Sequence, residues 1–158
     1  MLSESARMAT TAELRFRVQA PNSQARATAI VALDAPGEFV VRRLAEASWQ
    51  HATFLTGLTA DGALTTLGDR PTSVRAEVDA ADQVIMVVGA GGQAEGAEAI
   101  GRACSLKRVT TTALIVGARE ASEADLSKTL VQLRPWSLMV VIANSDDYVA
   151  DMMAALRV

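Results

Sequence analysis

The sequence predicts a three-layer α/β domain with a doubly wound, mostly parallel sheet, on three observations. Short continuous apolar runs at residues 28–33 and 83–88 have the pattern of strands that are covered on both faces. Segments with helical periodicity separate these runs from the strands that follow them. Connections of this length join parallel strands and place helices on both faces of the sheet.

The first half of the chain begins with an alternating segment. In residues 13–20 the apolar Leu14, Phe16 and Val18 alternate with polar residues, which is the period of a half-exposed strand. We expect this strand at the edge of the sheet, where it can form a hairpin with the strand at 28–33. The remaining predictions for this half are a helix at 38–50, a strand at 53–58, a short extra strand at 63–67, and a short helix at 71–80 with its proline in the first turn.

The second half alternates strands and helices more regularly. Strands are predicted at residues 83–88, 111–116 and 137–143, and helices at 93–107, 122–133 and 146–156. Ser122 is suited to cap the middle helix, and Leu126, Leu130 and Leu133 form its apolar stripe. The pattern predicts one Rossmann-like domain over residues 13–158, preceded by a flexible segment at 1–12.

Composition and charge exclude several classes of function. The net charge is −3 and the basic residues are scattered, so the chain lacks the basic stripe of a protein that contacts a phosphate backbone. No apolar run approaches the roughly 20 residues that span a bilayer. The sequence therefore predicts no nucleic-acid or membrane partner. A polar start and a lone cysteine favour the cytoplasm.

The chain offers little for metal or nucleophilic chemistry. It contains one histidine, His51, and one cysteine, Cys104, so a zinc or iron site of the ordinary type is not expected. His51 is predicted at the end of a strand opposite to the ligand-binding edge of a parallel sheet. Cys104 lies among core-type residues of a predicted helix, which favours a buried and unreactive thiol. The sequence identifies no cofactor and no catalytic residue.

A glycine-rich turn at residues 89–92 is the strongest local signal for a ligand. Gly89, Ala90, Gly91 and Gly92 follow a predicted strand and precede a predicted helix, where backbone N–H groups can approach a phosphate. The turn matches neither a P-loop nor the dinucleotide-binding fingerprint. The same glycines also have a purely structural explanation, because a tight strand-to-helix turn needs glycine. In the ligand interpretation Arg119, after the next strand, is the charge partner.

Other polar residues follow neighbouring strands at the same predicted edge. Asp34 lies in the first strand-to-helix turn, where its carboxylate would repel phosphate, and Pro36 removes a backbone donor. We interpret both as residues that start a helix. Asn144 lies at the end of the last strand and can bind a ligand or, with Asp146 and Asp147, a cation, although both aspartates are also suited to begin the last helix.

The second half of the chain resembles the nucleotide-binding domain of the tubulin-like division GTPases of the FtsZ family. The resemblance is carried by residues 81–92, a strand that leads into paired glycines. It continues through the following helix, the strand at 112–116, and residues 138–146, which include Asn144 and Asp146. It implies a fold that binds nucleotide at the glycine-rich turn. The chain departs from the family at the signature glycine–threonine repeat, where it has Gln93, Ala94, Glu95 and Gly96. The resemblance therefore implies a degenerate domain that does not hydrolyse GTP.

Three functions remain open on the sequence. The first is a non-catalytic interaction module that binds a partner chain, most simply another copy of itself. The second is binding of a small anionic ligand or nucleotide at residues 89–92. The third is a hydrolase or transferase that uses Asp34, Glu120 or Asp146 as acid or base, and it has the least support because a paired-carboxylate mechanism needs a defined geometry.

Overall fold

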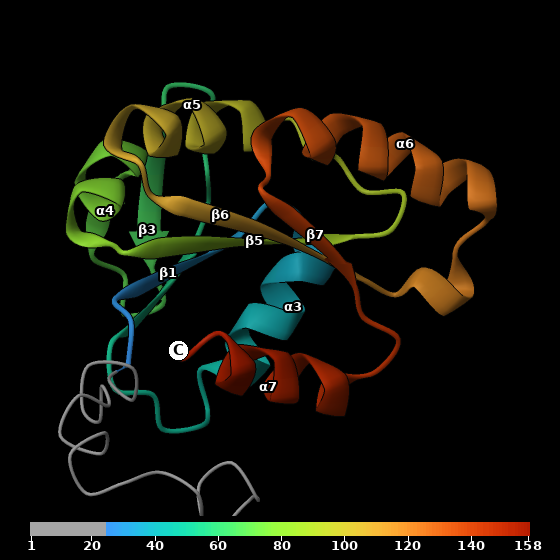
Figure 1. The fold of residues 1–158 in the computed structure, drawn as a ribbon, viewed down its shortest axis with the longest axis horizontal. Coiled ribbons are helices and arrows are strands. Elements are labelled where there is room, and N and C mark those ends of the chain that lie inside the picture. Colours follow the sequence, from blue (N-terminus) through green and yellow to red (C-terminus); the bar gives the residue numbers. More distant parts are fainter. Residues whose placement is uncertain (1–24) are drawn as a thin grey trace, which may run out of the picture.

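A seven-stranded sheet runs through the middle of the molecule in the computed structural model, which describes residues 25–158 (Figure 1). The strand order is β4-β3-β2-β1-β5-β6-β7. Strands β2, β1, β5, β6 and β7 are parallel, and β3 and β4 continue the sheet as an antiparallel extension. The prediction of a mostly parallel, doubly wound sheet is confirmed.

Strands and helices alternate over most of the described chain. The strands are β1 (Thr28–Ala32), β2 (Ala52–Thr56), β3 (Ala63–Thr66), β4 (Pro71–Ser73), β5 (Gln83–Gly89), β6 (Thr110–Val116) and β7 (Met139–Ile142). The α-helices are α3 (Ala35–Leu44), α4 (Val74–Ala80), α5 (Ala97–Lys107), α6 (Glu123–Leu133) and α7 (Asp146–Ala155). Two short 3-10 helices, η2 (Ala118–Glu120) and η3 (Arg134–Trp136), flank α6.

Each face of the sheet has its own apolar layer. Helices α4, α5 and α6 cover one face, and α3 and α7 cover the other (Figure 1). Strand β5 shows why both faces are dry: Ile85 packs with the α3 and α7 layer, and Met86 packs with the α4 and α5 layer. All seven residues of β5 are buried, as the continuous apolar run predicts.

Two predicted helices begin elsewhere than expected. Residues 71–73 form strand β4, paired with β3, and the helix begins only at Val74 with Ser73 as its N-cap. The predicted start of α5 at residue 93 is also wrong, since the helix begins at Ala97. The Ala94 N–H is bonded to the Gln132 side chain of α6 at 3.0 Å, which holds this segment outside the helix.

Helix α3 begins and ends earlier than the periodicity predicts. Asp34 caps its start, and Pro36 lies in its first turn. At its end the Trp49 indole N–H donates to the Leu44 carbonyl at 2.7 Å. This bond satisfies a terminal carbonyl that would otherwise continue the helix.

The predicted edge strand at residues 13–20 lies outside the described residues, as does the predicted flexible segment at 1–12. The expected hairpin with the strand at 28–33 is wrong, because β1 pairs with β2 on one side and with β5 on the other. Within residues 25–158 the two edges of the sheet are β4 and β7. No helix in that part of the chain is long and apolar enough to cross a membrane.

Candidate functional site

The strand order reverses between β1 and β5, and this point is where an open α/β sheet offers a ligand crevice. The chain leaves β1 toward α3 on one face and leaves β5 toward α5 on the other (Figure 1). Asp34 follows β1, and the glycine turn, residues 89–92, follows β5. The structure therefore brings two candidates that are far apart in the sequence into direct contact.

Asp34 joins these two strand ends through its carboxylate. Its Oδ1 accepts from the Gly37 N–H at 2.8 Å, which caps α3. The Gly89 N–H donates to both carboxylate oxygens at 3.1 Å. A Cβ atom at Gly92 would overlap Asp34 Oδ2, so glycine is required there for this close approach. The interpretation of Asp34 as a cap is confirmed, and the bond to Gly89 is an additional role that the sequence did not reveal.

All four backbone N–H groups of the glycine turn donate to acceptors within the protein. The acceptors, in chain order, are the Asp34 carboxylate at 3.1 Å, the Val116 carbonyl at 2.8 Å, the Thr129 hydroxyl at 2.8 Å and the Gly89 carbonyl at 2.9 Å. A phosphate cradle works through N–H groups that point at the ligand. In this structure the groups that would form the cradle are already bonded.

Helix α6 supplies acceptors that the sequence analysis missed. Thr129 is fully buried; its hydroxyl accepts from Gly91 and donates to the Asp125 carbonyl at 3.2 Å. Gln132 accepts from Ala94 at 3.0 Å. Thr129 therefore holds the glycine turn against α6, and Gln132 holds the segment that follows it. A polar residue on the helix face that also carries Leu126 and Leu133 is the signal that could have identified Thr129.

The other candidates lie, like the glycine turn, at the carboxyl end of the parallel strands. Arg119 lies in η2 directly after β6, and its side chain is exposed. Asn144 follows β7 and is exposed. Ser145, between Asn144 and α7, is the residue that caps α7, with its hydroxyl accepting from the Tyr148 N–H at 3.3 Å.

Two surface hollows lie near opposite ends of the parallel strands. One of about 550 Å³ opens between the ends of β1 and β2 and the start of α5, and its charged lining residues are Glu95, Glu98 and Arg102. Another, of about 760 Å³, lies at the opposite end of the parallel strands, next to Trp136 and Leu138. Neither is lined by a residue of the glycine turn.

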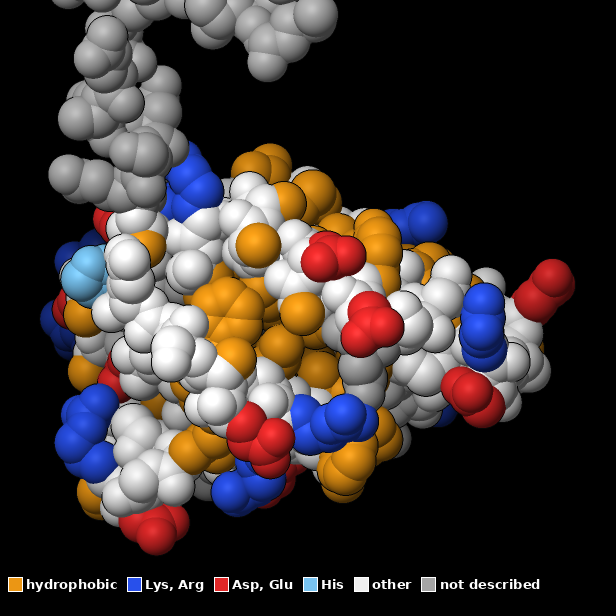
Figure 2. All heavy atoms as spheres, turned by 90° about the horizontal axis from the view of Figure 1, so that it is seen from below, with side chains coloured by type: hydrophobic (Ala, Val, Ile, Leu, Met, Phe, Trp, Pro, Cys, Tyr) orange, Lys and Arg blue, Asp and Glu red, His pale blue; other side chains and the backbone are white. Residues whose placement is uncertain are grey.

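A third hollow, of about 210 Å³, lies between α3 and α7. Figure 2 views the molecule from the side of these helices and shows hydrophobic side chains gathered around a depression, with charged side chains at its margin. Val40, Leu44 and Trp49 line it, and Arg43 and Asp147 provide charges of opposite sign. The lining is apolar and lacks a convergent set of polar groups, so it is suited to contact rather than to catalysis.

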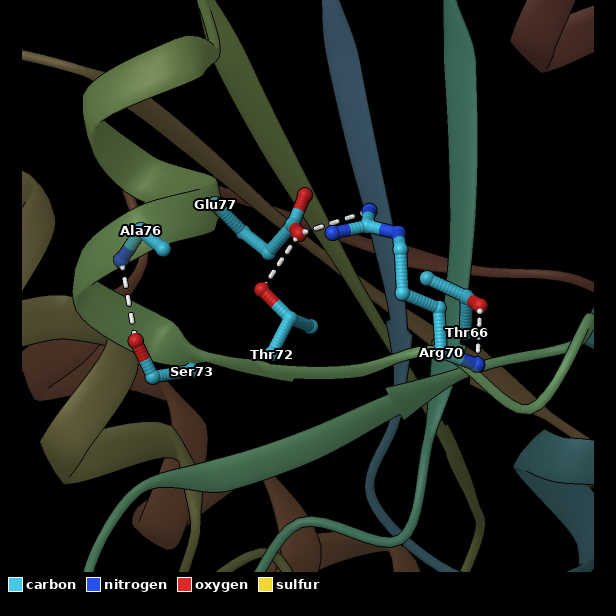
Figure 3. Close-up of polar contacts among 6 residues, drawn as sticks. All are labelled: Thr66, Arg70, Thr72, Ser73, Ala76 and Glu77. Carbon is cyan, nitrogen blue, oxygen red and sulfur yellow. Dashed lines mark hydrogen bonds and ion pairs between the residues drawn. The ribbon is translucent and has the colours of Figure 1, made fainter.

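Glu77 is a buried carboxylate that the sequence analysis did not single out (Figure 3). Its Oε1 accepts from the Thr72 hydroxyl at 2.7 Å and forms an ion pair with the Arg70 guanidinium at 3.4 Å. Thr72 belongs to β4 and Arg70 to the turn before it, whereas Glu77 belongs to α4. The contacts therefore fasten the antiparallel extension of the sheet to the helix that follows it.

The remaining titratable candidates do not converge. Cys104 is buried in α5, and burial raises the pKa of its thiol to about 11, which keeps it neutral at physiological pH. His51 is exposed and precedes β2, and its carbonyl accepts from the Thr28 N–H at 2.8 Å, at the amino ends of the strands. Among residues 25–158 no three histidine, cysteine or acidic side chains lie together in a way that could hold a metal ion.

Comparisons with known proteins support the fold. No known family's sequence profile matches the chain. No curated protein matches it by sequence. The chain is similar in structure to translation elongation factor SelB of Methanococcus maripaludis, solved with the GTP analogue GppNHp, with a TM-score of 0.54 and 15% identity. The match covers 84% of this chain and 33% of the SelB chain, so this chain spans about a third of that protein. The similarity shows an α/β fold of the kind found in a GTPase; a specific relation to the FtsZ family is not shown.

Proposed function

We propose that this chain is a non-catalytic α/β interaction module in which the glycine turn is a structural joint. The observation that carries the proposal is that each backbone N–H of residues 89–92 has an acceptor in the protein itself. Bonding an incoming phosphate would require breaking those bonds. One of the acceptors is the Asp34 carboxylate, whose negative charge opposes an anion at the turn.

Binding of a small anionic ligand or nucleotide at the glycine turn is the second candidate. The position of the turn at the reversal of strand order favours it, as does the GTP analogue in the SelB structure. This function needs a rearranged turn in which Asp34 and Thr129 release Gly89 and Gly91, with Arg119 as the cationic partner. A hydrolase or transferase that uses rim carboxylates has less support, because the Asp34 carboxylate is engaged by two backbone donors.

A thermal-shift titration separates the two candidates. The probes are guanine and adenine nucleotides with Mg²⁺, inorganic phosphate, sugar phosphates and nucleotide coenzymes. A ligand at a hundred times its Kd stabilises the native state by about 2.7 kcal/mol. In a chain of 158 residues that gain raises Tm by roughly 5–10 °C.

If the proposal is right, none of these probes produces a saturable rise in Tm. A saturable rise in Tm would contradict it, and its reduction by Arg119→Ala would locate the ligand at the glycine turn. The matched control is Arg75→Ala, since Arg75 is an exposed arginine on α4, the helix that follows the edge strand β4.

A further inference from the structure

The two edges of the sheet differ in how they are protected. Strand β4 is short and polar, and Pro71 interrupts its donors. Strand β7 has the sequence Met-Val-Val-Ile, with neither proline nor a charged residue. Among residues 25–158 no strand pairs with the outer edge of β7, and its side chains are 41% exposed at Met139 and 38% at Ile142, with the adjacent Leu138 78% exposed. Natural proteins normally block such an edge, because it pairs readily with another strand.

The orientation of the β7 backbone follows from its bonds to β6. The Ala143 N–H donates to the Ile115 carbonyl at 2.8 Å, so Ala143 faces β6. Successive residues of a strand face opposite sides in the plane of hydrogen bonding, which turns Val141 toward β6 as well. Val140 and Ile142 therefore direct their N–H and C=O groups toward the open edge.

We infer that the open edge of β7 pairs with β7 of a second copy of this chain, antiparallel and about a two-fold axis at Val141. This inference rests on the proposed function and names its partner. In this register Val140 lies opposite Ile142 of the second copy, and the two residues exchange both backbone hydrogen bonds. The symmetry repeats the exchange, so every outward-facing N–H and C=O of the strand is used.

A second symmetric register, with the axis at Val140, would leave the hydrogen bonding between the two strands less complete. It would place Ile142 opposite Leu138 of the second copy. The Leu138 N–H already donates to the Thr111 carbonyl at 3.1 Å, so the Ile142 carbonyl would lack a donor. Of these two registers, the axis at Val141 is the one that gives each outward-facing N–H and C=O of β7 a partner.

Side chains fit the same arrangement. The pairs across the new interface are apolar and mostly β-branched, the type that stabilises adjacent antiparallel strands.

The oligomeric state of the full chain tests this inference. We expect sedimentation velocity to show a concentration-dependent dimer for the unmodified chain. Ile142→Pro removes an outward N–H and leaves the ladder to β6 intact, so it should weaken the dimer at least tenfold. Ile142→Lys is the second variant, in case the proline variant fails to fold. Phe39→Lys is the control, since Phe39 is an exposed apolar residue on α3, near the hollow between α3 and α7.

A cysteine pair tests the register. Val141→Cys should form an intermolecular disulfide on mild oxidation, because directly opposite residues in a pair without hydrogen bonds have Cα atoms about 4.5 Å apart. Val140→Cys is the matched control; its partner in the second copy is diagonal, roughly 7–8 Å away, and should not cross-link efficiently. Efficient cross-linking of Val140→Cys alone would overturn the register.

Two outcomes would overturn the inference. One is a strict monomer at several hundred micromolar. The other is a dimer weakened by Phe39→Lys and unaffected by Ile142→Pro and Ile142→Lys, which would place the interface on α3 and α7. A monomer without nucleotide binding leaves the proposed function standing, and a nucleotide-binding dimer contradicts only that function.

Discussion

Replacing Asp34 with alanine removes the group that joins the first turn of α3 to the end of β5. The variant loses an N-cap, which contributes about 1 kcal/mol on average. It also loses the bond from Gly89, a buried donor facing a charged acceptor, at about 1.5–3 kcal/mol. We therefore expect Asp34→Ala to lower the free energy of unfolding by about 3 kcal/mol, which lowers Tm by roughly 6–12 °C for a chain of this size.

Equilibrium unfolding in urea measures this loss, and Ser122→Ala is the matched control. Ser122 caps α6 by accepting from the Asp125 N–H at 3.1 Å, a bond within the same helix, so its loss should cost about 1 kcal/mol. The difference between the two variants isolates the bond to Gly89. If Asp34→Ala costs no more than Ser122→Ala, the carboxylate does not hold the two strand ends together, and the account of the joint is refuted.

Three further predictions concern buried polar groups. Thr129→Val keeps the volume of the side chain and leaves the Gly91 N–H without its acceptor, so urea unfolding should show a loss of about 1 kcal/mol; an unchanged midpoint would contradict the role of Thr129. Glu77→Ala removes a buried acceptor, with the exposed Arg70 partner adding little, and should cost about 2 kcal/mol, whereas Arg70→Ala should cost less than 1 kcal/mol; equal losses would contradict this division. Burial raises the pKa of the Cys104 thiol to about 11, so the stability it contributes is complete below about pH 9 and is lost as pH rises to about 11; Cys104→Ala should flatten that part of the pH profile, and an identical slope in both proteins would be inconsistent with it.

The parts of the fold that hydrophobic pattern determines were predicted well. Strands β1, β5 and β6 are continuous apolar runs, and burial on both faces leaves them few alternatives. Residues 71–73 were mistaken for helix, because proline in the first turn of a helix is as favourable as proline on an edge strand. Only pairing with β3, a tertiary contact, decides between the two.

The sequence correctly predicts that Asp34 and the glycine turn lie at the same end of the strands, but their bonding was not predictable. Glycines after a strand indicate that a backbone comes close to something, and the sequence cannot specify whether that neighbour is a phosphate or a side chain. Here the neighbours are Asp34, 55 residues away in the sequence, and Thr129, 38 residues away. These contacts depend on strand order and on the seating of α6, which local periodicity does not encode.

The claim that the glycine turn is bonded to the protein itself is tested most directly by the amide resonances of residues 89–92 in an NMR titration of the ¹⁵N-labelled chain. We expect the Gly89 amide to exchange slowly with solvent. We also expect Mg²⁺–GTP and inorganic phosphate to leave the resonances of all four amides unshifted. Saturable shifts of the Gly89 and Gly91 resonances with either probe, together with loss of the slow exchange, would contradict it.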